Sequence, residues 1–141
     1  DRLAGLREAV AGTDVTVSTI EVPHLATEDG LQAGAQIIAM PASERPDAVF
    51  AANDMVALGV LTTLLRHRIR VPEEIALVGF DDVAQAHQGV VPLTSVRQPG
   101  YEIGRAAGAA LLQQLADPSA PPPATTPFPA ELIVRESTVG R

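Results

Sequence analysis

Cysteine and lysine are both absent from this chain of 141 residues. The absence of cysteine excludes disulfides, thiolate metal sites and a cysteine nucleophile. The only three histidines, His24, His67 and His87, do not stand at metal-ligand spacing from one another. The sequence therefore predicts neither a metal site nor a bound cofactor.

The common catalytic motifs are missing as well. The chain contains no nucleophile elbow, no H-E-x-x-H, no Walker loop and no G-x-G-x-x-G. Three of its serines, Ser43, Ser95 and Ser137, have no triad context around them. The adjacent acids Asp81 and Asp82 leave a glycosidase-like acid pair as one alternative. Apart from this alternative, the sequence predicts that the protein is not an enzyme.

A basic stripe is the next missing feature. The net charge is −7, and the ten arginines are scattered, apart from Arg66, Arg68 and Arg70. Nucleic-acid affinity rests on cationic contacts to phosphate, which an acidic chain of this kind does not offer. We interpret the three neighbouring arginines as a solvated helix end, where cations favour the helix dipole. This part of the protein is therefore not expected to contact DNA.

We expect no membrane span, since no apolar run approaches the about 20 residues that a span needs, and the sequence shows no signal-peptide pattern. The chain also lacks an initiator methionine. It opens on DRLAGLREAV, in which Leu3, Leu6 and Val10 follow the spacing of a buried helical face. We therefore expect a piece of a longer polypeptide that begins inside a helix.

What is present is an alternation of helical and extended patterns. Helices are expected at 2–11, 27–40, 54–67 and 101–115, and strands at 15–20, 48–52, 75–80, 94–97 and 130–135. Six prolines between Asp117 and Pro129 predict a connection across the surface. Strands alternating with helices predict the α/β class, with a parallel sheet covered by helices on both faces.

Polar pairs follow two of the predicted strands: Asn53-Asp54 and Asp81-Asp82. Ligands of open parallel sheets bind outside the carboxyl ends of the strands. Carboxylates and carboxamides there suit the adjacent hydroxyls of a sugar. Two local interpretations stay open beside this one. In the first pair, Asn53 or Asp54 caps the next helix, and both interpretations hold together if Asp54 caps while Asn53 points into a cleft. In the second pair, Asp81 and Asp82 form a turn.

The predicted helix from Asp54 to His67 carries more apolar surface than one face of a sheet requires. Its apolar positions are Met55, Leu58, Leu61, Leu64 and Leu65. They indicate either core packing alone or core packing together with a subunit interface.

Four blocks of sequence, in order, carry a resemblance. AVFAANDMVALGVL, RVPEEIALVGFDD, PLTSVRQP and ELIVREST resemble the LacI/GalR family of bacterial transcriptional regulators, and so do RLAGLREAV and TEDGLQAGAQIIA. The resemblance implies a helix-turn-helix domain, a hinge, and a core like that of periplasmic sugar-binding proteins (type I). That core has two α/β subdomains with an effector cleft between them, and this chain matches its C-terminal part.

The resemblance also implies a division of the chain. Residues 1–93 match the C-terminal effector-binding subdomain, incomplete at its start. Residues 94–129 match a crossover strand, a helix and a Pro-rich return that belong to the N-terminal subdomain. Residues 130–141 match the terminal strand that rejoins the first sheet. The helix at 101–115 should then keep an uncovered apolar face. Such a fragment is unstable alone, pairs with another copy, or is a portion of a fuller chain.

Residue by residue, Arg2, Asn53 and Asp81 match positions that hydrogen-bond effector in sugar-responsive members. Phe50 matches a position that packs on the ligand in some members. Met55 and Leu58 match part of the family's dimer interface. Leu25 lies near a position that is aromatic in some members.

The resemblance therefore predicts the effector-sensing and dimerisation portion of a cytoplasmic, sugar-responsive, LacI-type regulator. Its partners are a small-molecule effector and a second copy in a homodimer, with no membrane, and with DNA only through the missing N-terminal domain. The alternative is a periplasmic sugar-binding protein of an uptake system. The blocks VPEEIALVGFDD and ELIVREST favour the regulator.

Overall fold

The computed structural model describes residues 2–119, 121 and 127–139. Its helices are α1 (Arg2–Ala9), α2 (Thr27–Ala39), α3 (Asp54–Arg66) and α4 (Gly100–Ala116), with short 3-10 turns η1 (Ala42–Glu44) and η2 (Ala84–His87). Its strands are β1 (Ala48–Phe50), β2 (Ala76–Phe80), β3 (Thr94–Arg97) and β4 (Glu131–Ile133). Each element falls within two residues of a predicted one, apart from the two short turns.

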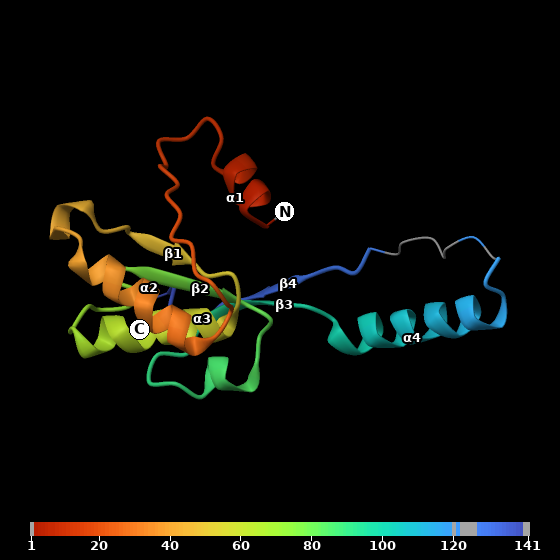
Figure 1. Cartoon of the computed structure of the whole chain (residues 1–141). Coiled ribbons are helices and arrows are strands. Elements are labelled where there is room, and N and C mark those ends of the chain that lie inside the picture. The colour runs from red at the N-terminus through yellow and green to blue at the C-terminus, as the bar shows by residue number, and fades with distance from the viewer. Residues whose placement is uncertain (1, 120, 122–126, 140–141) are drawn as a thin grey trace.

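The strands form one sheet in the order β1-β2-β3-β4 (Figure 1). β1, β2 and β3 run parallel, whereas β4 pairs with β3 in the antiparallel direction. Parallel neighbours need a long crossover, and α3 provides it between β1 and β2. The predicted α/β class is confirmed, with a sheet that is parallel except at one edge.

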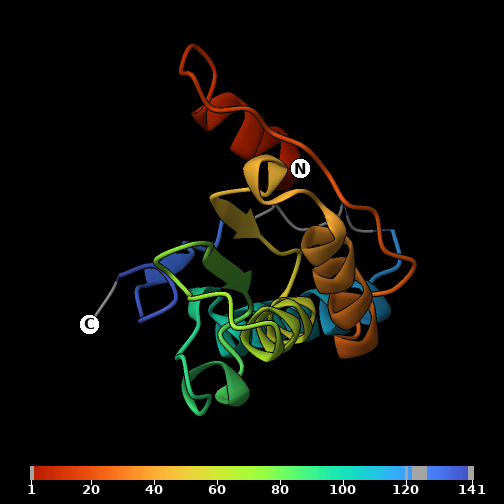
Figure 2. The same cartoon turned by 90° about the vertical axis from the view of Figure 1, so that its left-hand side faces the viewer.

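Helices α2 and α3 pack against each other and form the layer on one face of the sheet (Figure 2). Glycines let the two backbones approach closely, because a Cβ on Gly59 would lie 2.7 Å from the Cα of Gly30. The side chains buried deepest between this layer and the sheet are Ile37 of α2, Leu64 of α3, Leu77 of β2, and Ile75 and Leu93, which directly precede β2 and β3. The core therefore lies between α2, α3 and the middle strands.

Helices α1 and α4 stand outside this core. Neither contains a buried residue. α1 lies near the β1 side of the sheet, and α4 projects away from it at the far end of β3 and β4 (Figure 1). The leucines of α4 are 60–70% exposed, namely Leu111, Leu112 and Leu115. The prediction that this helix keeps an uncovered apolar face is confirmed.

The predicted strand at 15–20 is wrong. Residues 10–26 contain neither helix nor strand, and most of their side chains are exposed. A strand needs a neighbour to satisfy its backbone N–H and C=O groups. Within the described residues, β1 stands at the sheet edge and pairs only with β2. The extended pattern thus has no partner strand, and the segment crosses to α2 as irregular chain.

The Pro-rich connection is described at 117–119, 121 and 127–129, where it forms neither helix nor strand; the rest of it lies outside the described residues. Among the described helices, none combines the length and the apolarity that crossing a membrane demands.

Candidate functional site

The parallel strands bring polar side chains from distant parts of the sequence to one edge of the sheet. Asn53 follows β1, Asp81 follows β2 and Gln98 follows β3. Arg2 reaches the same place from α1: its guanidinium carbon lies 3.8 Å from the centroid of the Phe80 ring, and Nη1 donates to the Ala52 carbonyl. We call these residues the carboxyl edge: Arg2, Asn53, Phe80, Asp81 and Gln98.

Asn53 is the N-cap of α3. Its Oδ1 accepts from the Val56 backbone N–H at 2.9 Å, and its Nδ2 donates to the Leu25 carbonyl at 3.0 Å. A carboxamide can make about four hydrogen bonds, so a second N–H and a lone pair remain for a ligand. The capping interpretation is confirmed for Asn53, and Asn53 also sits at the carboxyl edge.

Asp54 does not cap α3. The interpretation in which Asp54 caps the helix while Asn53 points into a cleft is therefore wrong. The Asp54 side chain is fully buried. Its Oδ1 accepts from the Ser95 hydroxyl at 2.6 Å, and its Oδ2 accepts from the Val83 backbone N–H at 2.8 Å. A buried carboxylate needs such donors, and here they tie the start of α3 to β3 and to the loop after β2.

The two adjacent acids after β2 have different surroundings. Both lie in the left-handed region, with φ of +107° at Asp81 and +54° at Asp82. Asp81 is exposed, and its Oδ1 accepts from Gln98 Nε2 at 2.8 Å. The Asp82 carboxylate is only 4% exposed and accepts from Arg135 Nη2 at 2.6 Å and Arg97 Nε at 2.7 Å. The turn interpretation is confirmed, and Asp81 is the acid that faces solvent.

The arginines set the charge of Asp82. Burial alone raises the pKa of this carboxyl, but hydrogen bonds and charge from Arg135 and Arg97 outweigh burial and lower its pKa below the ordinary value. A general acid needs a raised pKa. Asp82 therefore stays ionised and engaged, and it is poorly suited to the acid role in a glycosidase-like pair.

Apolar side chains flank the carboxyl edge. Phe50 is 38% exposed and pairs in register with Val78, on the same face of the sheet as Phe80. Leu25 is 54% exposed and reaches the edge through its carbonyl, the acceptor of Asn53. Sequence reasoning missed Phe80 and Gln98 as members of this edge. Gln98 carried a usable signal, because it directly follows a predicted strand, as Asn53 and Asp81 do.

The two residues predicted for a dimer interface lie on the outer side of α3. Met55 is 37% exposed and Leu58 is half-buried, and Leu65 continues the same helical face at 36% exposed. The opposite face of α3 is buried against α2 and the sheet. The core-packing interpretation holds for the buried face, and the subunit interface stays a prediction for the outer face.

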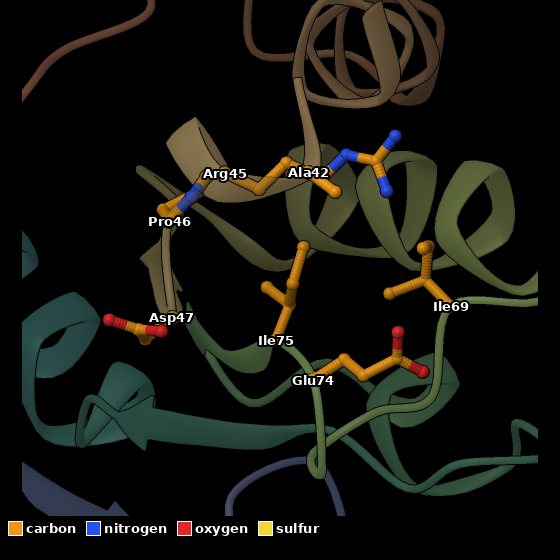
Figure 3. A pocket seen from close by; sticks show the side chains of 7 residues that line it. All are labelled: Ala42, Arg45, Pro46, Asp47, Ile69, Glu74 and Ile75. Carbon is orange, nitrogen blue, oxygen red and sulfur yellow. The ribbon is translucent and has the colours of Figure 1, made fainter. Parts of the chain in front are cut away.

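A hollow of about 200 Å³ opens at the other end of the strands (Figure 3). Asp47 and Ile75, which line it, directly precede β1 and β2. Glu74 at its rim accepts from Arg70 Nε at 2.8 Å, and this bond lowers the pKa of Glu74. Because ligands of open parallel sheets bind at the carboxyl ends, this hollow is not the functional candidate. Within the described residues, no cluster of histidine and acidic side chains could hold a metal ion.

Comparison with known proteins places this geometry in a family. Residues 1–138 match the periplasmic binding protein-like domain. The HTH-type transcriptional repressor PurR from Vibrio cholerae is 35% identical over 119 residues, which cover 83% of this chain and 35% of the repressor. The arabinose metabolism transcriptional repressor of Geobacillus stearothermophilus is 34% identical over 142 residues, with coverage of 98% and 39%.

Solved structures agree with the sequence relatives. A transcriptional regulator of the LacI family from Sanguibacter keddieii superposes with a TM-score of 0.88 at 38% identity, over 99% of this chain and 53% of that one. A LacI family regulator from Enterococcus faecalis with bound ribose gives a TM-score of 0.83 at 28% identity, over 97% and 48%. This chain therefore spans about a third to a half of the length of these proteins. It belongs to the periplasmic binding protein-like domains and, within them, to the LacI/GalR family of transcriptional regulators.

Proposed function

We propose that this chain is the effector-sensing and dimerisation portion of a LacI-type DNA-binding regulator, and that its carboxyl edge forms one wall of a sugar site. The observation that carries the proposal is the meeting of Arg2, Asn53 and Asp81 at one edge of the sheet, although they are separated by up to 79 positions in the sequence.

The chemistry of the edge suits a polyhydroxylated ligand. Arg2 offers a forked donor, Asn53 a remaining donor and acceptor, and Asp81 a solvent-facing carboxylate. Charged acceptors form strong hydrogen bonds to adjacent hydroxyls. The rings of Phe50 and Phe80 add apolar surface beside these groups, as ring-bearing ligands require. A ribose-bound structural neighbour and a relative named for arabinose metabolism support a sugar as the effector.

The opposite wall is assigned to a second subdomain. Residues 1–93 and 130–141 form the subdomain of the carboxyl edge, and residues 94–129 belong to the other. The exposed leucines of α4 support this division, because an apolar face of that size is normally covered. Effector binding closes the two subdomains, and the motion changes the spacing of paired DNA-binding domains in the cytoplasm. DNA is contacted only by the N-terminal domain of the whole protein.

A homodimer forms through the outer face of α3. Met55, Leu58 and Leu65 make an apolar stripe there, with Thr62 between them. Apolar side chains exposed in a line on one helix favour a second helix packed along them.

Two other functions have less support. An uptake-system sugar-binding protein shares the fold, but the matched relatives are repressors by name. A carbohydrate-active enzyme would need Asp82 as an acid, whereas both of its oxygens are held by arginines.

The test is calorimetric titration of the complete regulator with D-ribose, L-arabinose and, as a purine, hypoxanthine. At least one sugar should bind, and Asp81→Asn should weaken that binding by about 1–3 kcal/mol through loss of a charged acceptor. Asp14→Asn, a change of the same type at an exposed position away from the edge, should leave the affinity as it was. Unchanged affinity in Asp81→Asn would remove Asp81 from the site, and binding of hypoxanthine alone would replace the sugar by a purine.

A further inference from the structure

Asp82 sits where three parts of the chain meet. Its Oδ1 accepts from Arg135, which follows β4, and its Oδ2 accepts from Arg97, the last residue of β3. These two strands are the ones that lead to and from α4 (Figure 1). One carboxylate therefore connects the turn after β2 to both strands that leave the body of the molecule.

The backbone of the turn is held by the same neighbourhood. The N–H of Asp81 donates to the Val96 carbonyl at 2.9 Å, and the N–H of Asp82 donates to the Ser95 hydroxyl at 3.0 Å. The next N–H, that of Val83, donates to Asp54. Three consecutive amides are thus engaged. This matters because two successive non-glycine residues in left-handed conformations persist only where their surroundings hold them.

From this geometry we propose that Asp82 is a positioning residue for the effector site. Its ion pairs with Arg97 and Arg135 fix the left-handed turn that presents Asp81 at the carboxyl edge. They also bind that turn to the two strands that cross toward α4. The proposal rests on the function proposed above, in which Asp81 contacts the effector. It adds that the orientation of Asp81 depends on two arginines that do not contact the effector.

The two arginines differ in a way that allows a test. Arg135 is 14% exposed and also donates to the Leu93 carbonyl, so its removal disturbs the core. Arg97 is 50% exposed, and a second carboxylate, that of Glu131, lies 3.6 Å from its Nη1. Arg97→Gln therefore removes one of the two ion pairs of Asp82, while the buried guanidinium of Arg135 keeps its partner. Glu131→Gln is the matched control, because it removes the other acidic neighbour of Arg97 and leaves Asp82 paired.

The first readout is hydrogen exchange of the 81–83 amides in the complete regulator without ligand. Arg97→Gln should speed their exchange about tenfold, since a charged hydrogen bond that restrains the turn is lost. Glu131→Gln should exchange as wild type, because an exposed pair contributes little. Asp82→Asn should accelerate exchange further. Wild-type exchange rates at 81–83 in Arg97→Gln would overturn the proposal, even if Asp82→Asn fails to fold.

The second readout separates positioning from stability. In Arg97→Gln, affinity for whichever of D-ribose and L-arabinose binds wild type should fall about fivefold while the protein stays folded and the urea midpoint shifts only slightly. Arg97→Lys, which keeps the charge, should recover part of that affinity. Equal affinity in wild type and Arg97→Gln would overturn the link to the effector. If neither sugar binds wild type, the sugar function fails, and the exchange rates still decide whether Asp82 holds the turn.

Discussion

Helix α3 in the body of the molecule and the α4 arm (Gly100–Ala116) have similar apolar content but opposite packing. α3 buries eight of its thirteen residues against α2 and the sheet, whereas none of the seventeen residues of α4 is buried. Both helices carry apolar faces in the sequence. The difference shows that an amphipathic pattern specifies a face to be covered, and that only the presence of a second element covers it.

The largest expected effect comes from replacing a glycine by alanine, once in the body and once in the arm. Gly59→Ala in the body places a Cβ against the Thr27 carbonyl oxygen and 2.7 Å from the Cα of Gly30. Overpacking between two backbones should lower the free energy of unfolding by about 3 kcal/mol. Gly104→Ala in the arm meets nothing within 4 Å. It should instead raise helix content, because alanine favours a helix by about 1 kcal/mol over glycine.

Urea unfolding measures the first change, and circular dichroism at 222 nm measures the second. The comparison between body and arm is contradicted if both substitutions stabilise this chain or both destabilise it. In the complete regulator, a loss of stability in Gly104→Ala would instead show that another element packs closely on the arm.

A smaller effect tests what covers the arm. Leu112 is 70% exposed here, so Leu112→Ala should leave the urea midpoint of this chain unchanged. In the complete regulator, the second subdomain should bury this side chain, and the same substitution should cost about 2 kcal/mol. Equal results in the two proteins would contradict the proposed division at 94–129.

The smallest effect concerns the charge at the junction of body and arm. The folded-state pKa of Asp82 is lowered by its arginines despite burial. Because the pKa is lowered on folding, the charged carboxylate stabilises the folded state when the pH is above the ordinary carboxyl pKa of about 3.9. This contribution disappears as the pH falls through the folded-state pKa. The difference in unfolding free energy between wild type and Asp82→Asn should therefore be constant near neutrality and shrink below about pH 4. A difference that does not change between pH 6 and pH 3 would contradict the ion pairs.

Local patterns were sufficient for most elements of the fold. The apolar spacing of α2 and α3 and the near-continuous apolar run of β2 predicted their positions, because these segments find partners within the chain. The segment 15–20 has an equally extended pattern, yet it forms no strand, because no strand lies beside it. Strand pairing requires two segments, and the pattern of one segment does not show whether a partner strand lies beside it.

The candidate site shows the same limit. Asn53 and Asp81 were predicted at one edge because polar residues that follow parallel strands converge there. The roles of Asp54 and Asp82 were not predictable, since their partners lie 15 to 53 positions away in sequence.

The sequence by itself determined the α/β class, the mostly parallel sheet and the edge at which polar side chains gather, because strand patterns and strand order set these features. The tertiary structure alone decided which carboxylate faces solvent. Asp81 and Asp82 are identical neighbours in the sequence, and only the arrival of Arg97 and Arg135 from two other segments buries the carboxylate of one while the other stays exposed.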